Sequence, residues 1–142
     1  MNWYSDPNER RKILMDRYLH PRFQGTLAGV KSRTYQAEHC ADKITLVLKT
    51  DAGKIKKALF SGHGCVIAIA SSDMVLEKVV GLNLSEACQW MSQYRQMIQL
   101  LPYPREKMGQ ANVLSKVGRH LNRQGCALLI YEALHDTLGC QI

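Results

Sequence analysis

The sequence has no long apolar run and no pattern of a secretory leader. No apolar run approaches the roughly 20 residues that a membrane-spanning helix needs. The opening residues, MNWYSDPNERRK, lack the apolar stretch of a secretory signal, so we expect a cytoplasmic protein without membrane contact. Repeats, low-complexity segments and long linkers are also missing. We therefore expect residues 1–142 to form a single domain with one core.

Paired cysteine motifs are missing as well. The five cysteines are Cys40, Cys65, Cys88, Cys126 and Cys140, and none belongs to a C-x-x-C pair. An odd number at wide spacing is a poor disulfide framework. Metal or thiolate chemistry is the better interpretation for a cytosolic protein of this size. We expect Cys88 to be a packing residue within a helix and Cys140 to lie at the surface without a role.

Aromatic residues are scarce, at 7% of the chain, whereas basic residues are abundant and give a net charge of +7. Part of the excess lies in a predicted hairpin, at Lys43, Lys49, Lys54, Lys56 and Lys57. No aromatic run accompanies these lysines, which counts against binding of single-stranded nucleic acid by stacking. A solvated basic face, an acidic protein partner and nucleic acid remain open as explanations of the charge.

The segment SDPNERRKILMDRYL predicts a helix near the N-terminus. Asp6 is a suitable N-cap, Pro7 suits the first helical position, and Glu9 would complete a capping box. Pro21 ends the helix. Its buried side is expected to be an apolar stripe, formed by Leu14, Met15, Tyr18 and Leu19.

Alternating apolar residues predict strands at 43–49 and 54–60, joined by a hairpin loop, TDAG, in which Gly53 is available for a positive φ. A further strand is expected near 30–36. From Cys65 onward the apolar period changes to that of helices. The order of one helix, then strands, then helices indicates an α+β fold, with a small antiparallel sheet of about three strands packed against helices.

The helical part of the sequence has clear boundaries. A helix of small and apolar residues runs from Cys65 to Gly81, and Asn83 with Glu86 forms a capping signal for the next helix. A break at 102–109 precedes a shorter helix expected around 110–120. The last helix ends at Gly139, and its apolar face consists of Cys126, Leu129, Ile130, Ala133, Leu134 and Leu138.

Four side chains near the ends of these elements could meet: Cys40, Asp42, Cys65 and Cys126. Cys40 and Asp42 point the same way if their segment is extended. Cys65 and Cys126 lie near helix N-termini, where the thiolate form is favoured. Three thiolates and one carboxylate would make a tetrahedral site suited to Zn²⁺. Spacing leaves the alternative open that these cysteines are small buried apolar residues.

Three histidines near the cysteines are further candidate ligands. These are His39, His63 and His120, and His63 attracts most attention because it lies two residues before Cys65. We expect a structural or solvent-facing role for each of them.

Several motifs along nearly the whole chain resemble those of the IscU/NifU-type family of iron–sulfur cluster assembly proteins. YLHPRFQGTL (18–27) is similar to the family's Tyr-x-Asn-Pro-Arg-Asn-x-Gly-x-Leu segment, and CAD (40–42) to its Cys-Gly-Asp motif. GCVIAIASSDMV (64–75) and GLNLSEA (81–87) are similar to two later segments, and Cys126 matches the family's third cysteine. The resemblance implies a SufE/NifU-like fold in which the three cysteines and Asp42 converge.

The surroundings of the third cysteine favour the SufU-like branch of this family. In the scaffold branch a His directly precedes that cysteine, whereas Gly125 precedes Cys126 here. RQGC (123–126) is similar to the SufU pattern Arg-x-Lys-Cys without the Lys. The long gap between Cys65 and Cys126 can hold the insertion typical of that branch. Ala41, in place of the usual Gly, is a second departure from the family pattern.

For a SufU-like protein, the resemblance implies Zn²⁺ held by Cys40, Asp42, Cys65 and Cys126. It also implies that sulfur is accepted from a SufS-like cysteine desulfurase. Ligand exchange would release Cys40 to attack the persulfide. Arg123 would steady the thiolate or the persulfide, and an exposed surface arginine is its alternative role. Whether the protein is an enzyme stays open between this sulfurtransferase and the hypotheses that follow.

Two other functions are weighed against the sulfurtransferase. The first is a scaffold on which a transient [2Fe–2S] cluster is assembled and passed to downstream iron–sulfur assembly or acceptor proteins. The second and weakest is a basic nucleic-acid-binding module with a structural zinc, which steeply salt-dependent binding would reveal.

Overall fold

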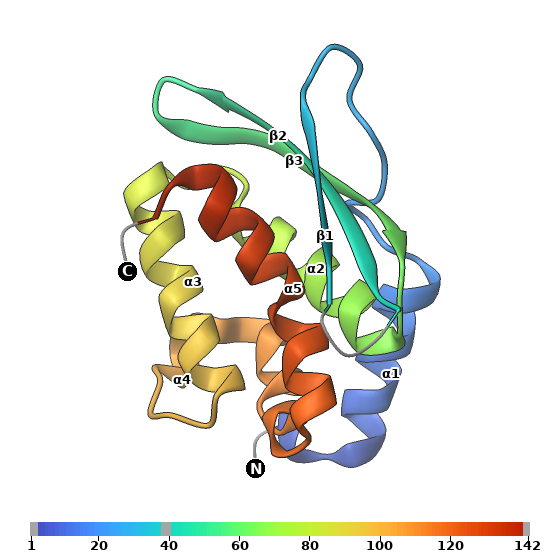
Figure 1. Cartoon of the computed structure of the whole chain (residues 1–142). Helices are drawn as coiled ribbons and strands as arrows, with labels where there is room; N and C mark the ends of the chain where they lie inside the picture. The colour runs from blue at the N-terminus through green and yellow to red at the C-terminus, as the bar shows by residue number, and fades with distance from the viewer. Residues whose placement is uncertain (1–2, 38–40, 141–142) are drawn as a thin grey trace.

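The structure is a computed structural model that describes residues 3–37 and 41–140 of the chain. Its helices gather on one side of a small sheet (Figure 1). In chain order the elements are the 3₁₀ turn η1 (Trp3–Ser5), α1 (Pro7–Leu19), β1 (Ser32–Gln36), β2 (Lys43–Asp51), β3 (Lys54–His63), α2 (Val66–Val79), α3 (Leu84–Ile98), α4 (Arg105–Met108), the 3₁₀ turns η2 (Gly109–Leu114) and η3 (Val117–Arg119), and α5 (Leu121–Leu138).

The three strands form one antiparallel sheet in the order β1-β2-β3, which confirms the predicted α+β class. The predicted hairpin joins β2 to β3, and both of its turn residues, Ala52 (φ 53°) and Gly53 (φ 77°), have positive φ. Two successive positive φ angles give a turn that matches the twist of a hairpin. Lys49 pairs directly with Lys57 on the exposed face of the sheet.

The opposite face of the sheet forms part of a single hydrophobic core. Ile44, Leu46 and Phe60 are buried on this face, as the alternating pattern of the strands requires. α2 contacts β3, α1 and α5, and its small residues Ala68, Ala70, Ser71 and Ser72 are fully buried. Small side chains at these positions let the neighbouring elements approach α2 closely, as the sequence predicted. Within residues 3–37 and 41–140, no helix is both long enough and apolar enough to cross a membrane.

The predicted apolar stripe of α1 is wrong for three of its four residues, since only Leu14 packs against the core. Met15 and Tyr18 are exposed and Leu19 is 59% exposed, whereas Arg17 is buried, with only 4% of its surface accessible. The helix is rotated because Arg17 pairs with two carboxylates of α2, Asp73 at 2.7 Å and Glu77 at 2.8 Å. The expected N-cap is confirmed, since the Asp6 side chain accepts a hydrogen bond from the Asn8 amide.

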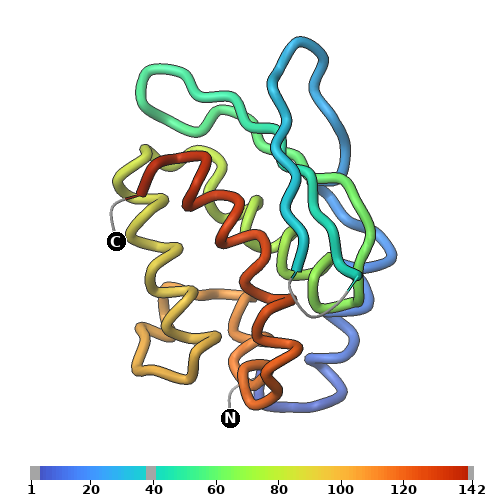
Figure 2. Tube along the Cα trace, viewed as in Figure 1, coloured from blue at the N-terminus to red at the C-terminus, as the bar shows by residue number. Residues whose placement is uncertain are grey.

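The segment after α1 is held against the edge of β3. The Phe23 amide donates to the Asp73 carboxylate at 2.7 Å, and the Phe23 carbonyl accepts from the Phe60 amide at 2.9 Å. The Gly25 amide in turn donates to the Phe60 carbonyl at 2.8 Å. Buried Asp73 therefore orders both α1 and the chain that leaves it. In Figure 2 this chain passes beside β3 before it returns as β1.

The shorter helix expected around 110–120 is replaced by the two 3₁₀ turns η2 and η3. Buried Asn112 stabilises this irregular path, because its side-chain amide donates to the carbonyls of Arg105 and Gly109 at 2.9 Å each. The final helix, α5, agrees with its predicted apolar face. Leu129, Ile130, Ala133 and Leu134 are buried, and Gly139 ends the helix with a left-handed conformation (φ 67°).

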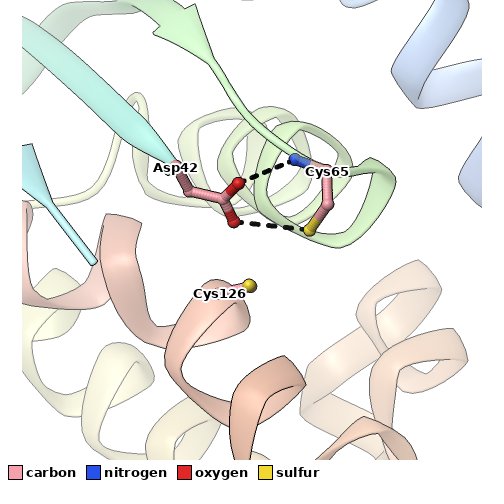
Figure 3. A group of neighbouring side chains, drawn as sticks. All are labelled: Asp42, Cys65 and Cys126. Carbon is pink, nitrogen blue, oxygen red and sulfur yellow. Dashed lines mark hydrogen bonds between the residues drawn. The ribbon is translucent and has the colours of Figure 1, made fainter. Parts of the chain in front are cut away.

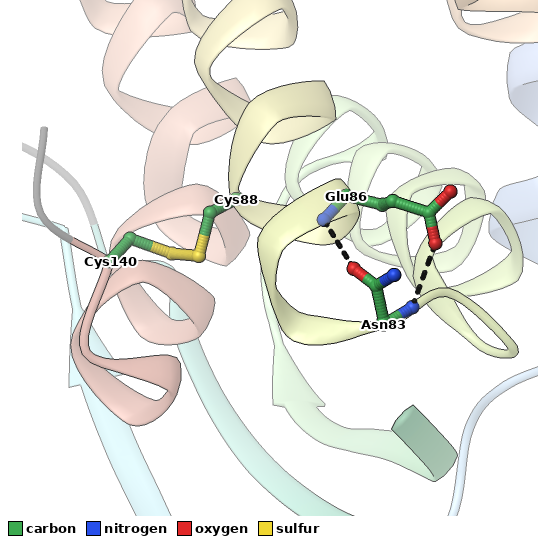
Figure 4. The surroundings of a disulfide bond; sticks show 4 residues. All are labelled: Asn83, Glu86, Cys88 and Cys140. Atoms are coloured by element: carbon green, nitrogen blue, oxygen red, sulfur yellow. Dashed lines mark hydrogen bonds between the residues drawn. A yellow bond between two sulfur atoms is a disulfide. The ribbon is translucent and has the colours of Figure 1, made fainter. Parts of the chain in front are cut away.

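The expectation that Cys88 and Cys140 are unpaired is wrong, because the two form a disulfide (Figure 4). Cys88 is half-buried in α3, two residues after Glu86. The predicted capping box of Asn83 and Glu86 is confirmed. The left-handed Gly139 turns the chain after α5, and this places Cys140 beside α3. The two cysteines are 52 residues apart in the sequence, and their pairing depends on how α3 and α5 pack, so it could not be predicted from local sequence.

Candidate metal centre

Three of the predicted ligands lie together at the end of the sheet where the central strand, β2, begins. One oxygen of Asp42 and the sulfur atoms of Cys65 and Cys126 all lie within 4.8 Å of one another (Figure 3). Asp42 directly precedes β2, Cys65 is the N-cap of α2, and Cys126 lies in the second turn of α5. The group thus joins three elements that are far apart in the sequence.

Cys65 is placed where a helix begins. Its Sγ accepts a hydrogen bond from the Ala68 amide at 3.4 Å, as an N-cap side chain does. The sulfur therefore lies beside the free backbone amides of the first turn of α2. The residue is exposed, which leaves its sulfur accessible from solvent.

Asp42 is buried, with 5% of its surface accessible. One carboxylate oxygen accepts from the Cys65 amide at 2.9 Å, and the other accepts from the Cys65 thiol at 3.4 Å. Gly64 permits this approach, because a Cβ there would lie 3.1 Å from the Asp42 carboxylate and from the Ala68 side chain.

Cys126 is the buried thiol of the group, with 6% of its surface accessible. It lies in the second turn of α5, where the influence of the helix N-terminus is weaker than in the first turn. Of the two thiols, Cys65 is therefore the one that lies at a helix N-terminus.

The remaining predicted site residues have different positions. Cys40 and His39 lie outside the described residues. Within the described part of the chain, His63 and His120 are exposed and do not belong to the ligand group. Arg123 is exposed in the first turn of α5, one helical turn before Cys126.

The donor set fits a zinc ion. In a tetrahedral site with Zn–S bonds of about 2.3 Å, two ligand sulfurs lie about 3.8 Å apart. The described group therefore needs only a small contraction to close around one ion. Two sulfurs with one carboxylate oxygen supply three positions, and a fourth ligand would complete the tetrahedron.

Two features of the structure were not predicted from the sequence. Gly64 makes room for Asp42, and its signal was the SGHG segment that precedes Cys65. Arg17 holds α1 beside α2. The sequence clue to this contact is the charged Asp73 within an otherwise mostly apolar helix. A buried carboxylate requires a buried cation or several donors, so Asp73 alone indicated such a partner.

A family profile described as the NifU-like N terminal domain matches residues 9–127. The chain belongs to this family. Over 127 aligned residues, it is 32% identical to an iron-sulfur cluster assembly scaffold protein IscU of Streptococcus pyogenes serotype M1. This alignment covers 89% of this chain and 80% of the relative. Over 125 aligned residues, it is 30% identical to the zinc-dependent sulfurtransferase SufU of Bacillus subtilis. This second alignment covers 87% of this chain and 85% of the relative.

Solved structures have the same fold as this NifU-family chain. A putative iron-sulfur cluster assembly scaffold protein for the SUF system from Fervidobacterium islandicum superposes with a TM-score of 0.85 at 26% identity, covering 89% of this chain and 94% of that one. A nitrogen-fixing NifU-like protein (N-terminal) from Brucella abortus has a TM-score of 0.79 at 20% identity, covering 88% of each chain. The latter similarity concerns the fold alone.

Proposed function

We propose that this protein is a zinc-binding sulfur acceptor in iron–sulfur cluster biogenesis, acting in the cytoplasm with a SufS-like cysteine desulfurase. The observation that supports this most directly is the ligand group of Asp42, Cys65 and Cys126, with donor atoms within 4.8 Å of one another. Membership of the NifU family and the similarity to a protein named zinc-dependent sulfurtransferase support the same function.

In this proposal Cys40 is the fourth ligand and also the sulfur acceptor. Bound zinc would supply a redox-inert cation that keeps the thiols deprotonated near neutral pH and tolerates exchange of a ligand. Asp42, Cys65 and Cys126 hold the site together, while Cys40 is the ligand that leaves it. Asp42 is fixed by the Cys65 amide, so the carboxylate and one thiol form a single unit.

The transfer itself is a thiol–persulfide exchange. The Cys40 thiolate attacks the outer sulfur of the desulfurase persulfide and forms a new S–S bond. The S–S bond within the desulfurase persulfide breaks, and the desulfurase cysteine leaves as a thiolate. No net oxidation or reduction occurs. Arg123 is exposed one turn before Cys126, and in this proposal it would stabilise the negative charge of the incoming persulfide.

A scaffold is the second candidate function. The same cysteines would assemble a transient [2Fe–2S] cluster and pass it to downstream acceptor proteins. The match to a protein named as a scaffold, at 32% identity over 80% of that relative, favours this alternative. A scaffold would form a visible chromophore on anaerobic reconstitution and transfer it to an apo-acceptor.

The test combines metal analysis with desulfurase turnover. We expect the purified protein to hold zinc and to accelerate the desulfurase, and Cys40→Ser to lose the acceleration while retaining part of the zinc. Cys126→Ser should lose both. Cys88→Ser is the matched control, because it removes a cysteine outside the ligand group.

Unchanged acceleration in Cys40→Ser would show that Cys40 is not the acceptor. A transferable chromophore together with no effect on the desulfurase would favour the scaffold instead.

A further inference from the structure

Tyr94 of α3 is fully buried, and its hydroxyl reaches the helix that carries Cys126. The hydroxyl donates a hydrogen bond of 2.8 Å to the carbonyl of Ala127, the residue that follows Cys126. Burial raises the pKa of Tyr94 well above its ordinary value, so the phenol stays protonated and remains a donor. The Tyr94 ring stacks on Trp90, with centroids 5.7 Å apart, and this fixes the direction of the hydroxyl.

The bond has a specific position along α5. This helix packs against α2 on one side and α3 on the other, as Figure 1 also shows. Buried small residues, among them Ala68 of α2 and Ala127 of α5, offer few directional contacts that would resist sliding or rotation of a helix. A directional hydrogen bond beside Cys126 fixes the height and rotation of α5 at the turn that carries the thiol.

We propose that Tyr94 is a positioning residue, which sets the distance of Cys126 from Cys65 and Asp42 through its bond to Ala127. The inference rests on the proposed function, since it concerns the geometry of the same metal site. Tyr94 acts through the backbone of α5, at the residue that follows Cys126. Its removal changes the site without changing the number of ligands.

The experiment compares Tyr94→Phe with Tyr103→Phe. Both variants lose one phenol hydroxyl, and the Tyr103 hydroxyl bonds at 3.0 Å to Asn112 rather than to α5. Metal affinity is measured by competition with a chelator, and ligand geometry is read from the sulfur-to-cobalt absorption of Co²⁺-substituted protein. Tyr94→Phe should weaken the affinity roughly three- to tenfold, the loss of one buried hydrogen bond, and shift the cobalt spectrum. Tyr103→Phe should leave both unchanged.

A metal-free measurement separates the two proposals. In the protein without metal, Tyr94→Phe should accelerate alkylation of buried Cys126 relative to the wild type, and Tyr103→Phe should not. If the wild type binds no metal through its thiols, the proposed function fails, and the alkylation rates alone decide the positioning role. If the wild type shows the cobalt–thiolate signal and Tyr94→Phe reproduces its affinity, spectrum and alkylation rate, the positioning role is refuted while the metal site stands.

A loss of stability in Tyr94→Phe without a shift of the cobalt spectrum would assign Tyr94 to packing and overturn the proposal.

Discussion

Gly64 is the residue whose missing side chain leaves space for the Asp42 carboxylate. In Gly64→Ala the new Cβ would lie 3.1 Å from that carboxylate, so the acid must move by a few tenths of an ångström. Displacing one ligand of a metal site typically weakens metal binding, and we expect a loss of about tenfold. Chelator competition with zinc measures the effect.

Gly125→Ala is the control for this substitution. A Cβ at Gly125 meets no other atom within 4 Å, and the residue lies within α5. Alanine is the better helix former, so this variant should gain up to about 1 kcal/mol of stability and keep its zinc affinity. Equal zinc affinities in the two variants would contradict the role given to Gly64.

The carboxyl of Glu77 should make the stability of the protein depend on pH. Its hydrogen bond from Arg17 holds the pKa of this carboxyl below the ordinary value of 4.5. Because the folded-state pKa lies below the unfolded one, the charged carboxylate stabilises the protein above pH 4.5, and the contribution is lost as the pH falls through the lowered pKa.

Glu77→Gln should therefore be less stable than the wild type at pH 7. The side chain is 50% exposed, so solvent screening keeps the difference below about 1 kcal/mol. The difference should vanish in acid, and urea unfolding across the pH range measures it. Exposed Glu106→Gln is the comparison, and a gap between wild type and Glu77→Gln that persists at pH 2 would argue against the ion pair.

Among the elements, α1 is the one that depends most on a single polar contact. Arg17→Met removes the cation from Asp73, which is fully buried, and leaves an uncompensated charge. Breaking a buried pair from one side costs about 3–5 kcal/mol, and we expect that loss in the free energy of unfolding by urea. Arg22→Ala, which breaks the exposed pair with Asp16, should cost less than about 1 kcal/mol.

The double variant Arg17→Met with Asp73→Asn checks the cause. Removing the buried charge should recover part of the lost stability. If the double variant were as unstable as the sum of the single variants, packing rather than charge would explain the effect of Arg17.

Element boundaries were predictable where a local signal decides them. The capping box of Asn83 and Glu86, the cap at Asp6 and the end at Gly139 all follow from residues within one helical turn. The rotation of α1 was not predictable in this way, because its apolar residues suggested one face and a distant carboxylate selected another. The 3₁₀ path of 109–119 likewise depends on Asn112, whose partners lie in neighbouring turns.

The candidate site was only partly accessible to sequence reasoning. The spacing of Asp42, Cys65 and Cys126 left convergence open, and the resemblance to a family implied it. The pairing of Cys88 with Cys140 had no local signal at all, since neither residue reveals which helix ends meet. Local periodicity predicts which face of an element is buried, whereas contacts between distant elements depend on the packing of the whole chain.

For the molecule as a whole, the disulfide is the strongest single restraint on the unfolded chain. It closes a loop of 52 residues, and the loss of chain entropy on closing such a loop corresponds to about 4 kcal/mol. Cys140→Ser should lower the free energy of unfolding by up to that amount in oxidising buffer. Denaturant titrations with and without reductant measure it.

Reduction provides the control for this prediction. A reducing cytosol keeps most thiols free, so the wild type in excess reductant should unfold at nearly the same denaturant concentration as Cys140→Ser. A difference that survives full reduction would mean that Cys140 contributes by packing, and intact mass before and after reduction confirms the state of the pair.

The ligand atoms of Asp42, Cys65 and Cys126 come from the start of a strand, the start of one helix and the interior of the last helix. No fragment that ends before α5 can assemble the group, however well its earlier elements form. During synthesis on the ribosome, the group can be completed only after α5 has emerged. A metal ion held by all three residues would therefore be bound only once α5 has folded against the earlier elements.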